Sequence, residues 1–321
     1  MPDELAKDND EHSWVVELPH YIGDLLPCSP STSNSSERQR LQGRVLVPRT
    51  HSVSIQLSQE ACDDLSLLGA LPTLLENLDV SIHDKSLEKT KFAALASRSI
   101  RSLAITNCRV SGQQLIEIAR STHLRQLDLT ASTLEALDWS WISKFHELRG
   151  LFLGGTTAGN ESIVEIASLQ MLEDLSLAQT AVTESAITHL WKLPSLRAAN
   201  LSDISLSSKS FGGVDKCESL KRLTLDKSLI SDREVKALSV ANQLESLSLT
   251  STKITDRGVI FLCEMIRLKA LRLRSCAITD KSLGMIISFR SLSLLDIHNT
   301  KITRSGYEFL RQEIPQCVII F

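Results

Sequence analysis

The residues of this sequence that could carry out chemistry are scattered rather than grouped. The seven cysteines are Cys28, Cys62, Cys108, Cys217, Cys263, Cys276 and Cys317. Their odd number and the absence of a C-x-x-C pair argue against a disulfide framework and a zinc ribbon. The eight histidines are equally dispersed, and no H-E-x-x-H, G-x-S-x-G or dinucleotide-binding glycine pattern occurs. We therefore expect a protein that is not an enzyme and has neither metal nor cofactor, with free, buried thiols in a reducing compartment.

Two short segments stand out from their surroundings. GGTTAGN at residues 154–160 is rich in glycine but lacks the Gly-Lys-Ser/Thr ending of a phosphate loop. We interpret its glycine pair as relaxing the backbone at a bend. The segment ALDWSWISKF at residues 136–145 holds Trp139 and Trp141. Trp141 could be an exposed contact for a partner, but a packed tryptophan is the more common case.

The elements that must position all these side chains are specified by a repeat. The pattern L-x-x-L-x-L begins at residues 75, 100, 124, 148, 172, 196, 220, 244, 268 and 292, so its first step is 25 and every later step is 24. Its alternating apolar residues predict a short strand with both side chains facing the core. Eight positions after the first residue, eight of the ten residues are Cys, Ser or Thr, which predicts a tight bend. Ser and Thr three positions later predict helix N-caps.

The full pattern, L-x-x-L-x-L-x-x-[TC]-x-[IV]-[TS]-[DE], resembles the leucine-rich repeat. Its length and the phrase T-x-I-T-D, as in TSTKITD at residues 250–256, are similar to the cysteine-containing repeats of F-box receptors and to bacterial leucine-rich-repeat proteins. The resemblance covers roughly residues 50–321. It implies an α/β fold, a right-handed solenoid or horseshoe with a parallel sheet on its concave face and helices on its convex face. It also implies an alternative role as the substrate-recognition subunit of a ubiquitin ligase, although no F-box is seen ahead of the repeats.

The ends of the sequence depart from the repeat. We predict an N-terminal segment at residues 1–45, made of a polar stretch and a Ser-rich linker at residues 29–40, and a repeat domain at residues 46–321. WVVELPHYIGDLLP at residues 14–27 could be a cap on the first repeat or a docking motif. SVSIQL at residues 52–57 predicts an early, degenerate strand, and residues 318–321 predict a strand that closes the last layer of core.

Composition further limits the classes of function that the sequence allows. The chain has 42% hydrophobic and only 4% aromatic residues, so its core is mostly aliphatic. The formal net charge of -3 argues against a general nucleic-acid coat. No apolar run approaches the ~20 residues of a membrane helix, and the acidic start MPDELAKDND is unlike a secretory signal. We expect a cytoplasmic monomer that contacts neither nucleic acid nor membrane.

The residues two, four and six positions after each first leucine should leave the concave face of the sheet. Most are small or polar, and a few are aromatic or charged. We predict that the latter contact a protein or peptide partner: Phe152, Arg222, Asp226, Arg272, Arg274, Asp296 and His298. The alternative is that these arginines and acids pair with one another. An enzyme with an unrecognised site is a further alternative.

Overall fold

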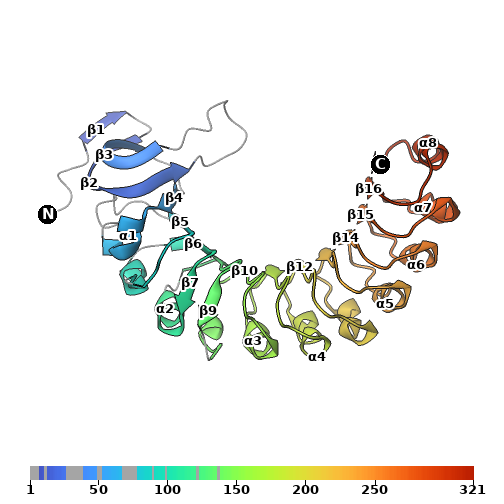
Figure 1. The fold of residues 1–321 in the computed structure, drawn as a ribbon, viewed down its shortest axis with the longest axis horizontal. Helices are drawn as coiled ribbons and strands as arrows, with labels where there is room; N and C mark the ends of the chain where they lie inside the picture. The colour runs from blue at the N-terminus through green and yellow to red at the C-terminus, as the bar shows by residue number, and fades with distance from the viewer. Residues whose placement is uncertain are drawn as a thin grey trace. The chain divides into compact units, whose positions relative to one another are not determined.

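The computed structural model describes residues 7–10, 13–26, 39–48, 53–66, 78–88, 90–97, 100–120, 123–135 and 138–321. The chain forms two compact units, Met1–Phe152 and Leu153–Phe321, and each is described by itself. Both are built from repeated turns of strand, bend and helix (Figure 1).

The first unit joins a small antiparallel sheet to a parallel one. The antiparallel strands are β1 (Lys7–Asp10), β2 (Ser13–Leu26) and β3 (Gln39–Pro48). The parallel strands are β4 (Val53–Leu57), β5 (Leu78–His83), β6 (Ile100–Thr106), β8 (Gln126–Asp128) and β10 (Gly150–Phe152). A second pair, β7 (Arg109–Ser111) and β9 (Thr133–Glu135), follows the bends. Short helices complete the turns: α1 (Gln59–Asp63), η2 (Phe92–Ser97), α2 (Gly112–Ile118) and η3 (Ile142–Lys144).

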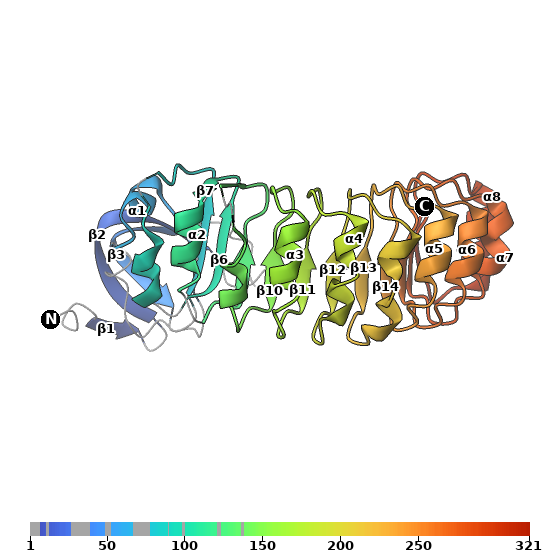
Figure 2. The ribbon, with the colours of Figure 1, turned by 90° about the horizontal axis from the view of Figure 1, so that it is seen from below.

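The second unit is a regular parallel sheet with one layer of helices. Its strands are β11 (Asp174–Ser176), β12 (Ala198–Asn200), β13 (Arg222–Thr224), β14 (Ser246–Ser248), β15 (Ala270–Arg272), β16 (Leu294–Asp296) and β17 (Val318–Ile320). Its helical elements are α3 (Asn160–Ile166), α4 (Glu184–Ile187), η4 (Leu190–Lys192), η5 (Ser208–Phe211), η6 (Val214–Lys216), α5 (Asp232–Leu238), α6 (Asp256–Leu262), η7 (Asp280–Ser282), α7 (Leu283–Ile286) and α8 (Arg304–Glu313). Within this unit the strands line one side and the helices the other, and Figure 2 views the helical layer from below. Among the described residues no helix combines the length and the apolar character that crossing a bilayer demands.

Strand register confirms the period of the repeat and corrects its first step. Leu223 pairs with Leu247, and Leu247 pairs with Leu271, as the period requires. At the start, however, Val80 pairs with Leu103 and Ile82 with Ile105, a step of 23 rather than 25. The predicted alignment began two positions too early because Leu75 and Leu78 imitate the repeat pattern. His83, assigned to the bend, therefore lies on the outward face of β5, where its Nδ1 meets the Thr106 hydroxyl.

The predicted end strands are present. β4 runs parallel to β5, and β17 runs parallel to β16. β2 pairs with β4, which is the position a cap would take. The predicted boundary at residue 45 falls within β3 and stays a prediction. Of the predicted linker at residues 29–40, all but the last two positions lie outside the described part of the chain.

Each turn leaves its strand through one residue with a left-handed backbone. Positive φ angles recur at Asp84, Asn107, Ala131, Gly155, Gln179, Asp203, Lys227, Ser251, Ser275 and Asn299. These positions follow the period of the strands, and no β-branched residue occupies any of them, as the steric cost of this conformation requires. Gly155 confirms that the glycine pair relaxes the bend. The N–H of the left-handed residue then donates to the next repeat, as from Lys227 to the Thr250 carbonyl at 2.8 Å.

The small residues of the bend bond to strand carbonyls, as predicted. The Thr252 hydroxyl donates to the Leu249 carbonyl of its own strand at 2.6 Å. Cys276, one repeat later, donates its thiol to that same carbonyl at 3.1 Å. Ser132 donates to the Ile105 carbonyl of the preceding repeat at 2.9 Å. Hydroxyl and thiol groups thus satisfy carbonyls that the bend removes from the sheet.

The helix starts are capped, and the caps are joined between repeats. Ser231 forms the predicted capping box with Glu234. Asp232 sits in the first turn, as the helix dipole favours, and its carboxylate also accepts from the N–H and hydroxyl of Thr255 in the next repeat at 2.9 and 2.6 Å. Gly258 leaves room for this contact, since a Cβ there would come within 2.5 Å of the Asp232 carboxylate. Asp256 and Asp280 bond the next threonines in the same way.

Replacing Leu249 by alanine should lower the free energy of unfolding by about 2–5 kcal/mol, because this fully buried side chain would leave a cavity. Chemical denaturation measures the loss. Leu229→Ala is the matched control, since that leucine is 64% exposed and its truncation should cost little. A loss below about half a kcal/mol at Leu249 would mean that the strand register is misassigned.

Replacing Lys227 by glycine should raise the free energy of unfolding by about 1 kcal/mol, because glycine adopts positive φ without the steric cost of a Cβ. Lys253→Gly, at an exposed position without positive φ, should instead lower it. Thermal or denaturant unfolding compares the two variants. Equal destabilisation by both would exclude a left-handed conformation at Lys227.

Candidate functional site

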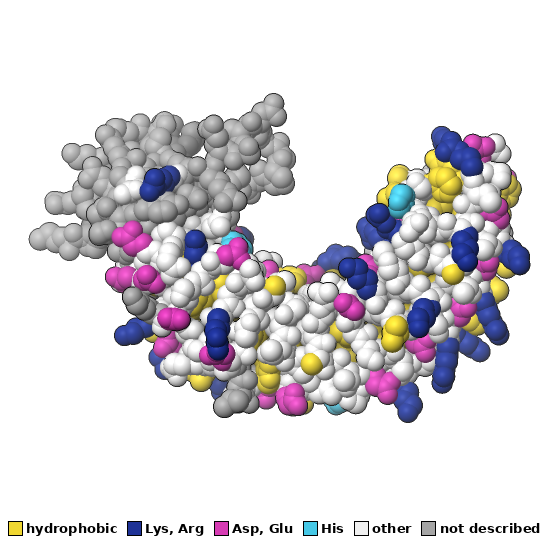
Figure 3. Space-filling view, viewed as in Figure 1, with side chains coloured by type: hydrophobic (Ala, Val, Ile, Leu, Met, Phe, Trp, Pro, Cys, Tyr) yellow, Lys and Arg dark blue, Asp and Glu magenta, His cyan; other side chains and the backbone are white. Residues whose placement is uncertain are grey.

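The strands of the second unit place six of the predicted contact residues on one face of its sheet. Arg222, Arg272 and Asp296 lie on β13, β15 and β16, and Asp226, Arg274 and His298 follow the ends of the same strands. The residues between them along each strand, such as Leu271 and Leu295, are fully buried. Arg272 is in register with Asp296 on the neighbouring strand. Figure 3 shows basic side chains on the inner side of the C-terminal strands above a mostly uncharged floor.

The two acids on this face are occupied by hydrogen bonds rather than by the arginines. The Asp226 carboxylate accepts from the Ser248 hydroxyl at 2.6 Å and from the Thr250 N–H at 2.8 Å. The Asp296 carboxylate, which is buried, accepts from the N–H of His298 at 3.0 Å. Both acids therefore hold the ends of the strands, and their negative charges are partly compensated by these donors.

The arginines differ in whether they form a salt bridge. Arg222 reaches across β12, where Ala198 leaves room, to form a salt bridge with Asp174 at 2.9 Å. Arg272 and Arg274 form no salt bridge with any acidic residue in the described part of the chain. Arg274 is exposed and Arg272 is half-buried. Arg222 thus pairs with an acid outside the predicted set rather than with Asp226 or Asp296, and the guanidinium donors of the two arginines of β15 are available.

Exposed apolar side chains lie on the same face two strands away from the two free arginines, and sequence reasoning did not assign them to the site. Val318 and Ile320 on β17 are 63% and 43% exposed, and they are in register with Leu294 and Asp296. The closing strand thus does more than cover the core, because its outward side chains extend the sheet face. The alternation of residues 318–320, read with the repeat register, is the signal that could have identified them.

Phe152, the remaining predicted contact, belongs to the first unit. It is the last residue of β10 and is in register with Asp128. Its half-buried ring lies against Gly150, where a Cβ would come within 3.2 Å of it. Trp139 and Trp141 are both buried, which confirms that they are packed residues.

The cysteines of the described chain are placed as core residues. None of Cys62, Cys108, Cys217, Cys263, Cys276 and Cys317 is bridged, and all but Cys263 are buried. Burial raises the pKa of Cys62 from its ordinary 9.0 to about 12 and also raises the pKa of Cys108, Cys217 and Cys276. Protonated thiols are poor nucleophiles and poor metal ligands. Within the described residues, no group of three or more His, Cys, Asp or Glu side chains is arranged to hold a metal ion.

Comparison with known proteins agrees with this architecture. The family model described as "Leucine Rich repeat" matches residues 241–263. Matches to chains of known structure number 425, so the fold is shared by many proteins and does not by itself indicate a partner. One is a crystal structure of an internalin (inlF) from Listeria monocytogenes, with 17% sequence identity and a TM-score of 0.56. That match covers 86% of this chain and 89% of the internalin. A search of curated protein sequences found no match. The chain thus has the fold of a leucine-rich-repeat solenoid, and the likeness to the internalin concerns the fold alone.

The cysteine environments predict a loss of stability in alkali. Cys62 keeps its proton up to about pH 12 in the folded protein, whereas the unfolded thiol ionises near 9.0. The stabilising contribution is therefore complete below pH 9 and declines as the pH rises toward 12. The free energy of unfolding, measured by denaturation from pH 8 to 10.5, should fall, and the fall should be shallower in Cys62→Ala. Identical slopes in the two proteins would contradict a raised pKa.

Proposed function

We propose that this protein is a non-catalytic scaffold that binds a protein or peptide through the sheet face of its second unit. The observation that carries the proposal is the state of Arg272 and Arg274. Both stand on a face whose acids, Asp226 and Asp296, are held by hydrogen bonds within the sheet. Two adjacent guanidinium groups without acidic partners can each donate a bidentate pair of hydrogen bonds to a carboxylate.

The composition of the surrounding surface supports a protein partner over a nucleic acid. Apolar Val318 and Ile320 lie on the same face two strands away from the arginines, and small residues such as Thr250 and Ala270 form the floor. Arginine set among apolar groups is typical of protein interfaces. A nucleic-acid surface would instead present many cations along a track, and the whole chain carries a net charge of -3.

The subtype of the repeat and the cellular compartment are part of the same proposal. The repeats that begin at residues 220, 244 and 268 are of the T-x-I-T-D type, because Asp232, Asp256 and Asp280 bond the Thr that opens the following helix. The compartment is the cytoplasm, because the described cysteines are unbridged and a reducing environment keeps thiols in that state.

The double substitution Arg272→Glu/Arg274→Glu should weaken partner binding by about 2 kcal/mol or more, since arginines at the centre of an interface often contribute that much. Both side chains point away from the core, so the thermal unfolding curve should change little. The intact chain and the variant are compared by affinity capture from a cell lysate, with quantitative mass spectrometry of the captured proteins.

The matched control is Lys144→Glu/Lys281→Glu, which makes the same change in net charge at two exposed lysines on 3-10 helices. Proteins that bind the sheet face should be captured by the control and lost by the arginine variant. The reverse ranking would place the binding surface on the helical side or on the N-terminal strands.

A further inference from the structure

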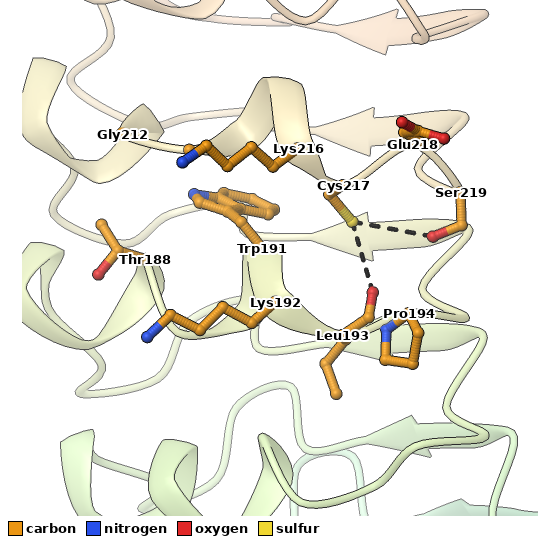
Figure 4. Close-up of a pocket in the computed structure, with 11 residues that line it drawn as sticks. Thr188, Trp191, Lys192, Leu193, Pro194, Gly212, Lys216, Cys217, Glu218 and Ser219 are labelled. Carbon is orange, nitrogen blue, oxygen red and sulfur yellow. Dashed lines mark hydrogen bonds between the residues drawn. The ribbon is translucent and has the colours of Figure 1, made fainter.

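A groove opens between two consecutive repeats of the second unit, away from the arginines of the sheet face. It has a volume of about 670 Å³ and lies between η4 of one repeat and η6 of the next. Figure 4 shows Trp191 in its middle, with Lys192 and Lys216 on either side of the indole. A volume of this size is ordinary for a ligand pocket.

The groove exists because one repeat lacks side chains where its neighbours have them. Gly212 and Gly213 separate η5 from η6, and Gly213 has a φ of +87°. The residues that correspond to Gly212 in the preceding and following repeats are Thr188 and Lys236, so both adjacent repeats carry a side chain where this one has none. A Cβ on Gly213 would meet nothing within 4 Å, so the space beside this glycine is open.

Trp191 forms a rigid apolar wall beside this opening. The residue is only 2% exposed, and its indole N–H donates to the Ser210 carbonyl at 2.7 Å. That bond fixes the plane of the ring. Leu193 and Pro194 continue the lining from the same repeat. An apolar group entering the groove therefore meets a preorganised but narrow apolar surface, since Pro194 is exposed while Leu193, like Trp191, is only 2% exposed.

The rim of the groove carries two lysines without counter-ions. Lys192 and Lys216 are separated by one full repeat and so occupy the same position in adjacent turns. Both are exposed, and neither forms a salt bridge with an acidic residue that the structure describes. The equivalent residues of the flanking repeats, Ser168 and Val240, are uncharged. Adjacent positive charges raise the local potential, and a carboxylate placed between them would lower the energy of both.

The charges of the groove are also unevenly arranged. In Figure 4 both lysine side chains extend toward the end that holds Thr188, whereas Glu218 and Ser219 stand at the opposite end. An anionic group is thus attracted at one end only, and a bound chain would have a defined direction. The presence of Glu218 disfavours a uniformly negative ligand such as a nucleic-acid backbone.

We propose that this groove is a second binding site, which takes a short peptide segment of a partner protein with a carboxylate side chain next to an apolar one. The carboxylate accepts a hydrogen bond from the ammonium group of Lys192 or of Lys216. The neighbouring apolar side chain packs against Trp191 and Pro194. This site is independent of the sheet face and extends the protein's binding capacity to a second surface.

The test is a selection of random heptapeptides displayed on phage against the full-length protein. We expect enriched peptides that combine Asp or Glu with an apolar residue. Their synthetic forms should change the emission of the tryptophan fluorescence, since Trp191 lines the groove, and Trp191→Phe should remove that change. Lys192→Glu/Lys216→Glu should weaken their binding at least about tenfold, as expected for reversing the charge around a carboxylate.

Two further variants separate this proposal from the sheet-face one. Lys144→Glu/Lys281→Glu should leave the peptides bound, because it changes the net charge equally at other places. Any peptide that fails to bind Arg272→Glu/Arg274→Glu but still binds Lys192→Glu/Lys216→Glu binds the sheet face. Such peptides test only the sheet-face site. The groove proposal is overturned if the selection enriches no acidic peptide, or if every enriched peptide binds the lysine variant as tightly as the unaltered protein.

Discussion

The fold of both units depends on one left-handed residue in every repeat. At that residue the chain leaves its strand, and in most repeats its N–H donates to a carbonyl at or just beyond the end of the next strand, as from Ser251 to Arg274 and from Ser275 to His298. The bond ties each bend to its neighbour and sets the spacing between bends at one repeat. The cost of positive φ is met at about ten positions in succession, so it must be outweighed by the burial of the leucines that the bend allows. In the sequence, this constraint is visible as the absence of β-branched residues at these positions.

The same geometry decides which charges on the sheet face are available. Where a strand ends, carboxylates can reach the free N–H groups of the bend, and Asp226 and Asp296 do so. These hydrogen bonds hold each carboxylate near the end of a strand. Arg272 forms no salt bridge with any acidic residue in the described part of the chain, although Asp296 lies in register with it on the next strand. The guanidinium groups of Arg272 and Arg274 thus keep their donors available on the sheet face.

Much of this could be predicted from sequence, since the period, the inward leucines and the helix caps are local patterns. The first register was wrong by two positions because Leu75 and Leu78 satisfy the pattern as well as the true strand, and only pairing with β6 decides between them. The availability of the arginines was also beyond sequence, because it depends on where the acids place their hydrogen bonds. Likewise, the groove is formed by Trp191 and Gly212, which belong to different repeats and become neighbours only through stacking.

A repeat under these constraints has few positions at which function can arise. The inward strand residues, the left-handed residue and the bend hydroxyls are all needed by the fold, and a change at any of them is felt as lost stability. The outward strand residues and helical positions that neither bond a strand end nor cap a helix are free of that demand. The two proposed binding surfaces, the sheet face and the groove beside Trp191, lie at such positions. Each combines apolar side chains that are exposed or preorganised with cations that form no salt bridge within the described part of the chain. Such charges are costly to keep together in the isolated protein, and an anionic partner removes that cost at the moment of binding.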